Sequence, residues 1–173
     1  QSPSSAASDV YKRQIKDLML DDGLNLTTIE LDEGEKIPND LTKFDGMFCM
    51  GGPMDTYMEK EYPWLIEEKK RIKEFVINLK KPYLGFCLGC QLLGEVVGGK
   101  VVKSNPAEIG IMDINFTDNK KEDSLFSKFP DNIKSLQWHS YEVQGIDKDP
   151  DITLLASSPV TKYQIFKYQH HAY

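Results

Sequence analysis

Two short apolar runs, each followed by a helical pattern, restrict the fold of this chain more than any other feature. Residues 44–53 read FDGMFCMGGP and residues 82–86 read PYLGF; both have the length of buried strands and lead into turns. Residues 62–81 and 89–99 follow them with helical spacing, and Gly98 and Gly99 are placed to end the second helix. Strands and helices that alternate in this way form βαβ units. We therefore predict an α/β fold with a mainly parallel sheet and helices on both faces.

The flanking regions supply further elements of the same single domain. Ile15, Leu18 and Met19 have helical spacing before Gly23, and residues 24–31, LNLTTIEL, alternate as a strand does. Beyond Lys100 the pattern changes to short strand-like pieces. These pieces are residues 99–103, 108–116, 133–144, 152–158 and 162–168, with one possible short helix at 123–129. We expect this half to form antiparallel edge strands and loops.

Composition excludes several functional classes. A net charge of -6 without a basic stripe argues against a nucleic-acid surface. The apolar runs are far shorter than a membrane span. Three cysteines at wide spacing form neither a disulfide framework nor a zinc pattern, so we expect a reducing, cytoplasmic location. No nucleotide-binding loop or metal cluster is visible, and we expect no cofactor and no metal.

The two ends suggest a fragment. The first residues, QSPSSAASDVYKRQ, lack an initiating Met and are rich in Ser and Ala, without the apolar segment of a signal peptide. We expect residues 1–14 to be a disordered or non-native head. The other end, FKYQHHAY, stops within a strand pattern. We therefore expect residues 15–173 to be an incomplete domain.

Cys87 is the strongest candidate for a catalytic residue. It lies in Gly85-Phe86-Cys87-Leu88-Gly89, between a predicted strand and a predicted helix, where a sharp turn lifts the central side chain clear of the sheet. The positive end of the helix dipole favours the thiolate, and the free N–H of Leu88 is available to an oxyanion. The alternative is a buried thiol, the commonest state of a cysteine. Cys49 and Cys90 fit that packing role better.

A cysteine nucleophile needs a base, normally a histidine held by a carboxylate. The chain has three histidines, His139, His170 and His171. From the residues alone, His139 or one of the terminal pair is the candidate base. A surface or hydrogen-bonding role is the alternative for all three.

The segment LGFCLGCQLLGEVVGGKV closely resembles the nucleophile segment of class I glutamine amidotransferases, which use a Cys-His-Glu triad. FDGMFCMGGPMDTYMEKEYPWL is similar to the oxyanion strand and loop of that family, QWHSYEV to its glutamine-contacting loop, and LLASSPVTKYQIFKY to the approach to its last catalytic strand. The resemblance covers residues 15–173. Its details look most like stand-alone relatives of the glutaminase domain of GMP synthase. It implies the flavodoxin-like fold of the family.

The resemblance also implies residue roles. Cys87 would attack the side-chain amide of glutamine, giving a γ-glutamyl thioester and ammonia, while the N–H groups of Gly52 and Leu88 hold the oxyanion. Gln91, Ser140 and Tyr141 would bind the substrate, and His139 would support their loop instead of acting as the base. The family takes its base from a His-Pro-Glu motif. Because that motif is absent from the sequence, the resemblance implies weak or no activity for these residues alone.

Glutamine is the substrate that the resemblance implies, with an ammonia acceptor or synthetase partner that the sequence does not identify. Two alternatives stay open. The same nucleophile serves hydrolysis of γ-glutamyl peptides, and the fold also serves catalytically silent binding or regulatory modules.

Overall fold

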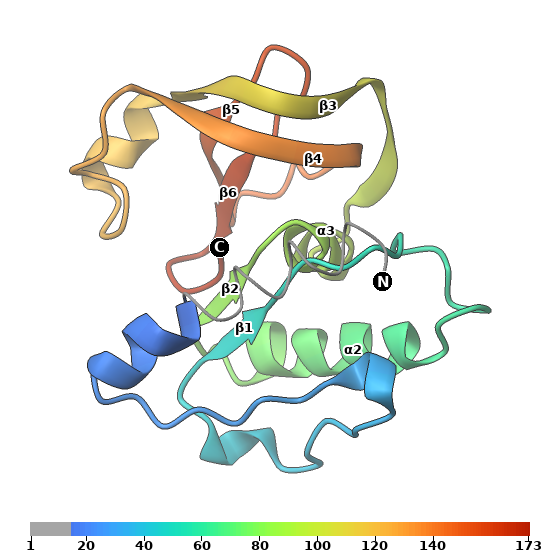
Figure 1. Ribbon diagram of the computed structural model, residues 1–173. Coiled ribbons are helices and arrows are strands. Elements are labelled where there is room, and N and C mark those ends of the chain that lie inside the picture. Colours follow the sequence, from blue (N-terminus) through green and yellow to red (C-terminus); the bar gives the residue numbers. More distant parts are fainter. Residues whose placement is uncertain (1–14) are drawn as a thin grey trace.

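The computed structural model describes residues 15–173, which form a parallel β-sheet region, several helices and an antiparallel sheet (Figure 1). Residues 15–21 are helical. The first half then contains the 3-10 turns η1 (Leu31–Glu33) and η2 (Leu41–Lys43), strand β1 (Met47–Cys49), helix α2 (Trp64–Lys73) with its π-helical continuation η3 (Glu74–Asn78), strand β2 (Tyr83–Gly85) and helix α3 (Leu88–Val96). The second half contains β3 (Lys100–Phe116), η4 (Asp118–Glu122), β4 (Asn132–Gln144), β5 (Ile152–Ser157) and β6 (Ile165–Tyr168).

Parallel pairing is confined to a small sheet. β1 pairs with β2 in parallel, with Met47 opposite Tyr83 and Cys49 opposite Gly85. On the other side of β2, Tyr83 forms a parallel bridge with Ala172. Residues 171–173 thus run beside β2, held by backbone hydrogen bonds such as that from the Tyr83 N–H to the His171 carbonyl at 2.9 Å.

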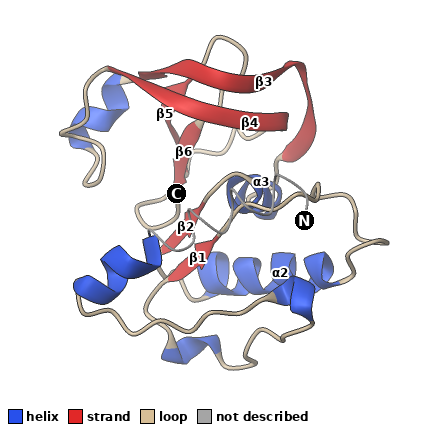
Figure 2. Ribbon diagram, viewed as in Figure 1, coloured by secondary structure: helices blue, strands red, loops and turns tan. Residues whose placement is uncertain are grey.

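The second half forms a four-stranded antiparallel sheet in the order β4-β3-β5-β6. β3 and β4 make a long hairpin, and their register shifts between Lys103 and Glu108. Helix α3 contacts β3 and β4 as well as β1, β2 and α2. Figure 2 shows the antiparallel sheet at the top of the molecule, with α3 between it and α2. α3 is therefore the element that joins the two sheets.

One hydrophobic core runs through these layers. α2 contributes Leu65 and Ile72 from its apolar face, and α3 contributes Leu88, Leu92 and Leu93. Tyr83, Val143 and Phe166 add side chains from the strands. Complete burial of one Leu or Ile side chain stabilises the fold by about 1.5–3 kcal/mol, so the two helical faces fix α2 and α3 against the strands.

The helices 15–21, α2 and α3 and the strands β1 and β2 agree with the predicted elements. The expected mainly parallel sheet is realised only in part, because the larger sheet is antiparallel. Residues 24–31 form no strand, since no described strand pairs with them. Residues 123–129 form turns instead of a helix, although the Asp123 carboxylate accepts the N–H groups of Leu125 and Phe126 as a helix N-cap would.

The predicted pieces 99–103 and 108–116 belong to one strand, β3, that continues through an irregularity. Residues 1–14, the predicted head, lie outside the described residues. Within residues 15–173, no helix is long and apolar enough to cross a membrane.

Candidate active site

Cys87 lies in the turn between β2 and α3, immediately before the first residue of the helix. Its φ of 52° and ψ of −105° are unusual for a residue with a side chain, and such strain is typical of nucleophile turns. The flanking glycines are required by packing. A Cβ on Gly85 would lie 2.5 Å from the Gly89 carbonyl carbon, and one on Gly89 would lie 2.3 Å from the Cys49 oxygen. The sequence pattern Gly-x-Cys-x-Gly therefore reflects a close approach of strand, helix and turn.

The Cys87 side chain is exposed, and the loop after β1 lines one side of it. A Cβ on Gly51 would lie 3.8 Å from the Cys87 Sγ, and one on Gly52 would lie 3.2 Å from the Leu88 side chain. The residues expected to supply the oxyanion-binding N–H groups, Gly52 and Leu88, therefore come from adjacent segments.

The electrostatics of Cys87 differ from the expectation of a dipole-stabilised thiolate. The pKa of the Cys87 thiol is raised above its ordinary value, chiefly because the surrounding protein desolvates it. A hydrogen bond from the Leu88 N–H lowers this pKa, while the negative charge of Asp55 raises it. Desolvation therefore outweighs the hydrogen bond at the helix terminus in its effect on this pKa.

Gln91, in the first turn of α3 after Cys87, contacts residues of β4. Gln91 Nε2 donates to the Tyr141 carbonyl at 3.1 Å, and His139 Nδ1 contacts the same oxygen at 3.0 Å. The Tyr141 hydroxyl lies 3.1 Å from that of Tyr57, with ring centroids 5.7 Å apart. The structure thus brings Gln91, His139 and Tyr141 together; Ser140, between them on β4, is half-buried.

The contact between Tyr57 and Tyr141 also changes the acidity of Tyr57. The hydrogen bond with Tyr141, and next that with Asp55, raises the pKa of the Tyr57 hydroxyl. The hydroxyl groups of Tyr57 and Tyr141 therefore connect the loop after β1 to strand β4.

None of the three histidines is hydrogen-bonded to Cys87 in the described part of the chain. His139 Nε2 lies 3.1 Å from the carboxylate of Glu108. His171 is buried and its Nε2 donates to the Val76 carbonyl at 3.0 Å, whereas His170 is exposed and packs on His171. The structure therefore places Cys87 in a turn beside the Gly51-Gly52 loop, and among residues 15–173 no histidine is hydrogen-bonded to it.

Sequence reasoning missed Gly51, Asp55, Tyr57 and Glu108. Gly51 and Asp55 border Cys87, and Tyr57 contacts Tyr141. In the sequence, Gly51, Asp55 and Tyr57 are marked by their position just after the first apolar run. Glu108 is one of two acids in the otherwise largely apolar segment EIGIMDINF of β3, and only the structure shows that it is buried.

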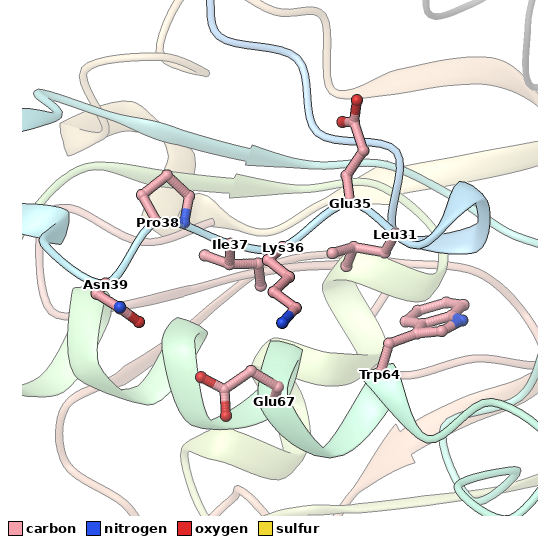
Figure 3. Close-up of a pocket in the computed structure, with 8 residues that line it drawn as sticks. All are labelled: Leu31, Glu35, Lys36, Ile37, Pro38, Asn39, Trp64 and Glu67. Carbon is pink, nitrogen blue, oxygen red and sulfur yellow. The ribbon is translucent and has the colours of Figure 1, made fainter.

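A separate recess of about 500 Å³ lies between residues 31–39 and the beginning of α2 (Figure 3). Its lining residues are Leu31, Glu35, Lys36, Ile37, Pro38, Asn39, Trp64 and Glu67. None of the candidate site residues lines this recess. Over residues 15–173, no group of three or more His, Cys, Asp or Glu side chains is arranged to hold a metal ion.

Comparison with known proteins places this geometry in one family. The sequence model of the family described as Glutamine amidotransferase class-I matches residues 6–172. A glutamine-hydrolyzing GMP synthase subunit from Picrophilus torridus is 29% identical over 158 residues, covering 91% of this chain and 74% of that protein. Gamma-glutamyl peptidase 3 of Arabidopsis thaliana is 30% identical over 137 residues, which cover 77% of this chain and 53% of that protein.

Among solved structures, a glutamine amidotransferase from Thermotoga maritima superimposes with a TM-score of 0.80 at 26% identity, covering 91% of this chain and 66% of that one. The chain thus spans between about half and three quarters of the length of these similar proteins.

Proposed function

Because the chain belongs to the class-I glutamine amidotransferase family, we propose that it carries the nucleophile and the glutamine pocket of an enzyme that hydrolyses the side-chain amide of glutamine and supplies ammonia to an acceptor. The observation that carries this proposal is the strained turn at Cys87, which sets an exposed thiol between the Gly51-Gly52 loop and the beginning of α3.

In the proposed reaction the Cys87 sulfur loses its proton and attacks the amide carbon of glutamine. The N–H groups of Gly52 and Leu88 stabilise the oxyanion of the tetrahedral intermediate. Breaking the C–N bond, with a proton transferred to nitrogen, releases ammonia and leaves a γ-glutamyl thioester on Cys87. Water then attacks the thioester carbon, and glutamate and the free thiol are formed.

We assign substrate binding to Gln91 and to the backbone of Ser140 and Tyr141, with His139 supporting their loop. The hydrogen bonds that converge on the Tyr141 carbonyl support this assignment, because they join the loop to α3 next to Cys87. The desolvated thiol also fits a site in which binding of glutamine precedes formation of the thiolate.

We propose that a synthetase partner consumes the ammonia, since several similar proteins are named as GMP synthase subunits. We also infer that residues 1–173 alone hydrolyse glutamine slowly, because in the described residues no histidine is hydrogen-bonded to Cys87. Removing the base of a catalytic triad costs on the order of a thousandfold or more in rate.

The test is the rate at which a diazo-ketone analogue of glutamine labels Cys87 at neutral pH. We expect rapid labelling that free glutamine suppresses, and none in Cys87→Ala. Cys49 and Cys90 serve as internal controls, because burial raises the pKa of both thiols, that of Cys90 to about 12. Labelling of Cys87 no faster than of these two, or labelling indifferent to glutamine, would refute the proposed pocket and favour a catalytically silent module.

A second candidate function is hydrolysis of γ-glutamyl peptides, which the likeness to a protein named gamma-glutamyl peptidase supports. Both reactions pass through the same thioester, so only the leaving group differs. Competition between glutamine and γ-glutamyl dipeptides for protection of Cys87 separates them. Stronger protection by the dipeptides would favour the peptidase.

A further inference from the structure

The loop between β1 and α2, residues 50–63, is attached to α3 at two points. Near its start, a Cβ on Gly52 would lie 3.2 Å from the Leu88 side chain at the beginning of α3. Further along, Thr56 is buried, and its hydroxyl donates to Glu95 Oε1 at 2.7 Å. Glu95 lies in the last turn of α3, about two turns, or roughly 10 Å, beyond Leu88. The loop therefore runs along α3 and contacts it near both helix ends.

Lys69, on α2, joins this loop to both helices. Its Nζ donates to the Thr56 carbonyl at 2.8 Å and to Glu59 Oε1 at 2.9 Å, and lies 2.7 Å from Glu95 Oε2. An ammonium group has three hydrogens, and these three oxygens account for all of them. Glu95 in turn accepts from the Thr56 hydroxyl with one oxygen and from Lys69 with the other. The loop, α2 and α3 thus meet in one closed network.

The charge of Lys69 is sheltered within the network. Burial by itself lowers the pKa of the Lys69 ammonium, but the hydrogen bonds and charges of Glu95 and Glu59 raise it above its ordinary value, so the group is charged at neutral pH. Only 20% of the Lys69 side chain and 25% of the Glu95 side chain are exposed. Water and salt screen such a pair less than a pair on the surface, so it restrains the groups that it joins.

The two N–H groups proposed to hold the oxyanion belong to two of the segments that this network connects. The Leu88 N–H belongs to α3, the helix that carries Glu95. The Gly52 N–H belongs to the loop, four residues before Thr56. Thr56 is held at its carbonyl by Lys69 and at its hydroxyl by Glu95. The position of the loop along α3, and with it the separation of the two N–H groups, therefore depends on Lys69 and Thr56.

We propose that Lys69 is a positioning residue: with Thr56 it holds the loop against α3 at the spacing at which the two oxyanion-binding N–H groups converge on one oxygen. This inference rests on the proposed function. Among residues 15–173, no hydrogen bond joins Lys69 to Cys87, so its effect reaches the reaction through the loop. An oxyanion forms when sulfur attacks a carbonyl carbon, and none forms when sulfur displaces a group from a saturated carbon. Lys69 therefore governs the first kind of reaction and leaves the second unchanged.

The test uses Lys69→Met on the 173-residue chain, which keeps an unbranched side chain and removes the ammonium. The γ-methyl ester of glutamate is the probe: Cys87 attacks its γ-carbonyl carbon, the C–O bond breaks, and methanol leaves with the thiol proton. The mass of acid-quenched protein reports the γ-glutamyl thioester. We expect the maximal rate of its formation to fall about tenfold or more, with the half-saturating ester concentration within about twofold, because the oxyanion contact exists only in the transition state. Alkylation by iodoacetamide, a displacement at saturated carbon, should also stay within about twofold.

Two further comparisons separate positioning from simple packing. Lys70→Met is the matched control, because Lys70 is the next residue of α2, its side chain is 69% exposed and its Nζ lies 3.7 Å from Glu67; all three quantities should stay unchanged. Thr56→Val removes the hydroxyl and keeps the shape, so it should slow thioester formation about tenfold. Thr56→Ser restores the hydroxyl and should recover most of that rate. A role in packing alone would rank the pair the other way, since Ser leaves a cavity at this buried position.

The outcomes distinguish this inference from the proposed function. Unsubstituted chain that forms no γ-glutamyl thioester, or that glutamine does not protect from the diazo-ketone analogue, would refute the function and the positioning role with it. With the function intact, normal thioester formation in Lys69→Met would refute the positioning role alone. A fall that iodoacetamide alkylation shares, or a rise in the half-saturating concentration instead, would also refute it. If Lys69→Met does not fold, the Thr56 pair decides, and a Val variant as fast as the Ser variant would overturn the proposal.

Discussion

Cys87 is subject to two opposing influences that arise from the same turn. The strained backbone before α3 exposes the sulfur and directs the Leu88 N–H toward it, which lowers the pKa of the thiol. The protein around the turn and the nearby Asp55 raise that pKa by more. The pKa of the Cys87 thiol is therefore governed more by its surroundings than by the helix terminus.

At the residue scale, alkylation of Cys87 by iodoacetamide should be slow at pH 7 and should increase through pH 9. The raised pKa means that the thiolate fraction is small at neutral pH and still rising above the ordinary thiol value of 9.0. Rates measured from pH 6 to 10, with urea-unfolded protein as the reference, test this. A plateau below pH 8 would show that the helix terminus dominates instead.

Two glycines let β1, β2 and α3 approach each other closely enough to form the turn. Gly85 packs against the backbone at Gly89, and Gly89 packs against the Cys49 carbonyl of β1. At the far end of the helix, a Cβ on Gly94 would lie 2.6 Å from Val143 of β4. α3 is thus closely packed at both ends, against backbone atoms at Gly89 and against the Val143 side chain at Gly94.

At the element scale, Gly89→Ala should destabilise the fold and distort the turn. The new Cβ would lie 2.3 Å from the Cys49 oxygen, so strand and helix must separate, at a cost of about 1–3 kcal/mol in the free energy of unfolding. Urea unfolding measures the loss, and labelling by the diazo-ketone analogue should slow in parallel. Gly46→Ala is the control, because its Cβ would make an ordinary contact at 3.7 Å.

The last described residues link the two halves of the molecule. Residues 171–173 run parallel to β2, and the Asp123 carboxylate accepts from Lys167 of β6 and from the Tyr173 hydroxyl. Strands that run in parallel end at the same edge of a sheet. The direction of residues 171–173 therefore leads toward the edge at which Cys87 lies.

At the scale of the whole molecule, a longer chain in which a His-Pro-Glu segment follows Tyr173 within a few residues should hydrolyse glutamine on the order of a thousandfold faster than residues 1–173. On the proposed function, a histidine at that edge would accept the proton of the Cys87 thiol, and the glutamate of the same segment would orient it. Ammonia release is the measurement, with the same longer chain carrying Ala for that His as the control. Equal activity of the two lengths would return His139 or His170 to consideration as the base.

The sequence by itself determined the local elements around Cys87. Apolar periodicity defined α2 and α3, short apolar runs defined β1 and β2, and glycines on both sides of Cys87 defined the turn. These features are local, because each depends on side chains within a few residues of chain. The same local signals failed at residues 24–31, which no described strand pairs with, and at residues 123–129, which form turns.

Only the tertiary structure decided which distant groups meet. The antiparallel order β4-β3-β5-β6, the pair of Glu108 with His139 and the contact of Tyr57 with Tyr141 all depend on strand register and helix packing. The raised pKa of Cys87 likewise follows chiefly from desolvation by the folded protein around the turn. Register and desolvation are properties of the assembled layers, and a periodic pattern within one segment cannot encode them.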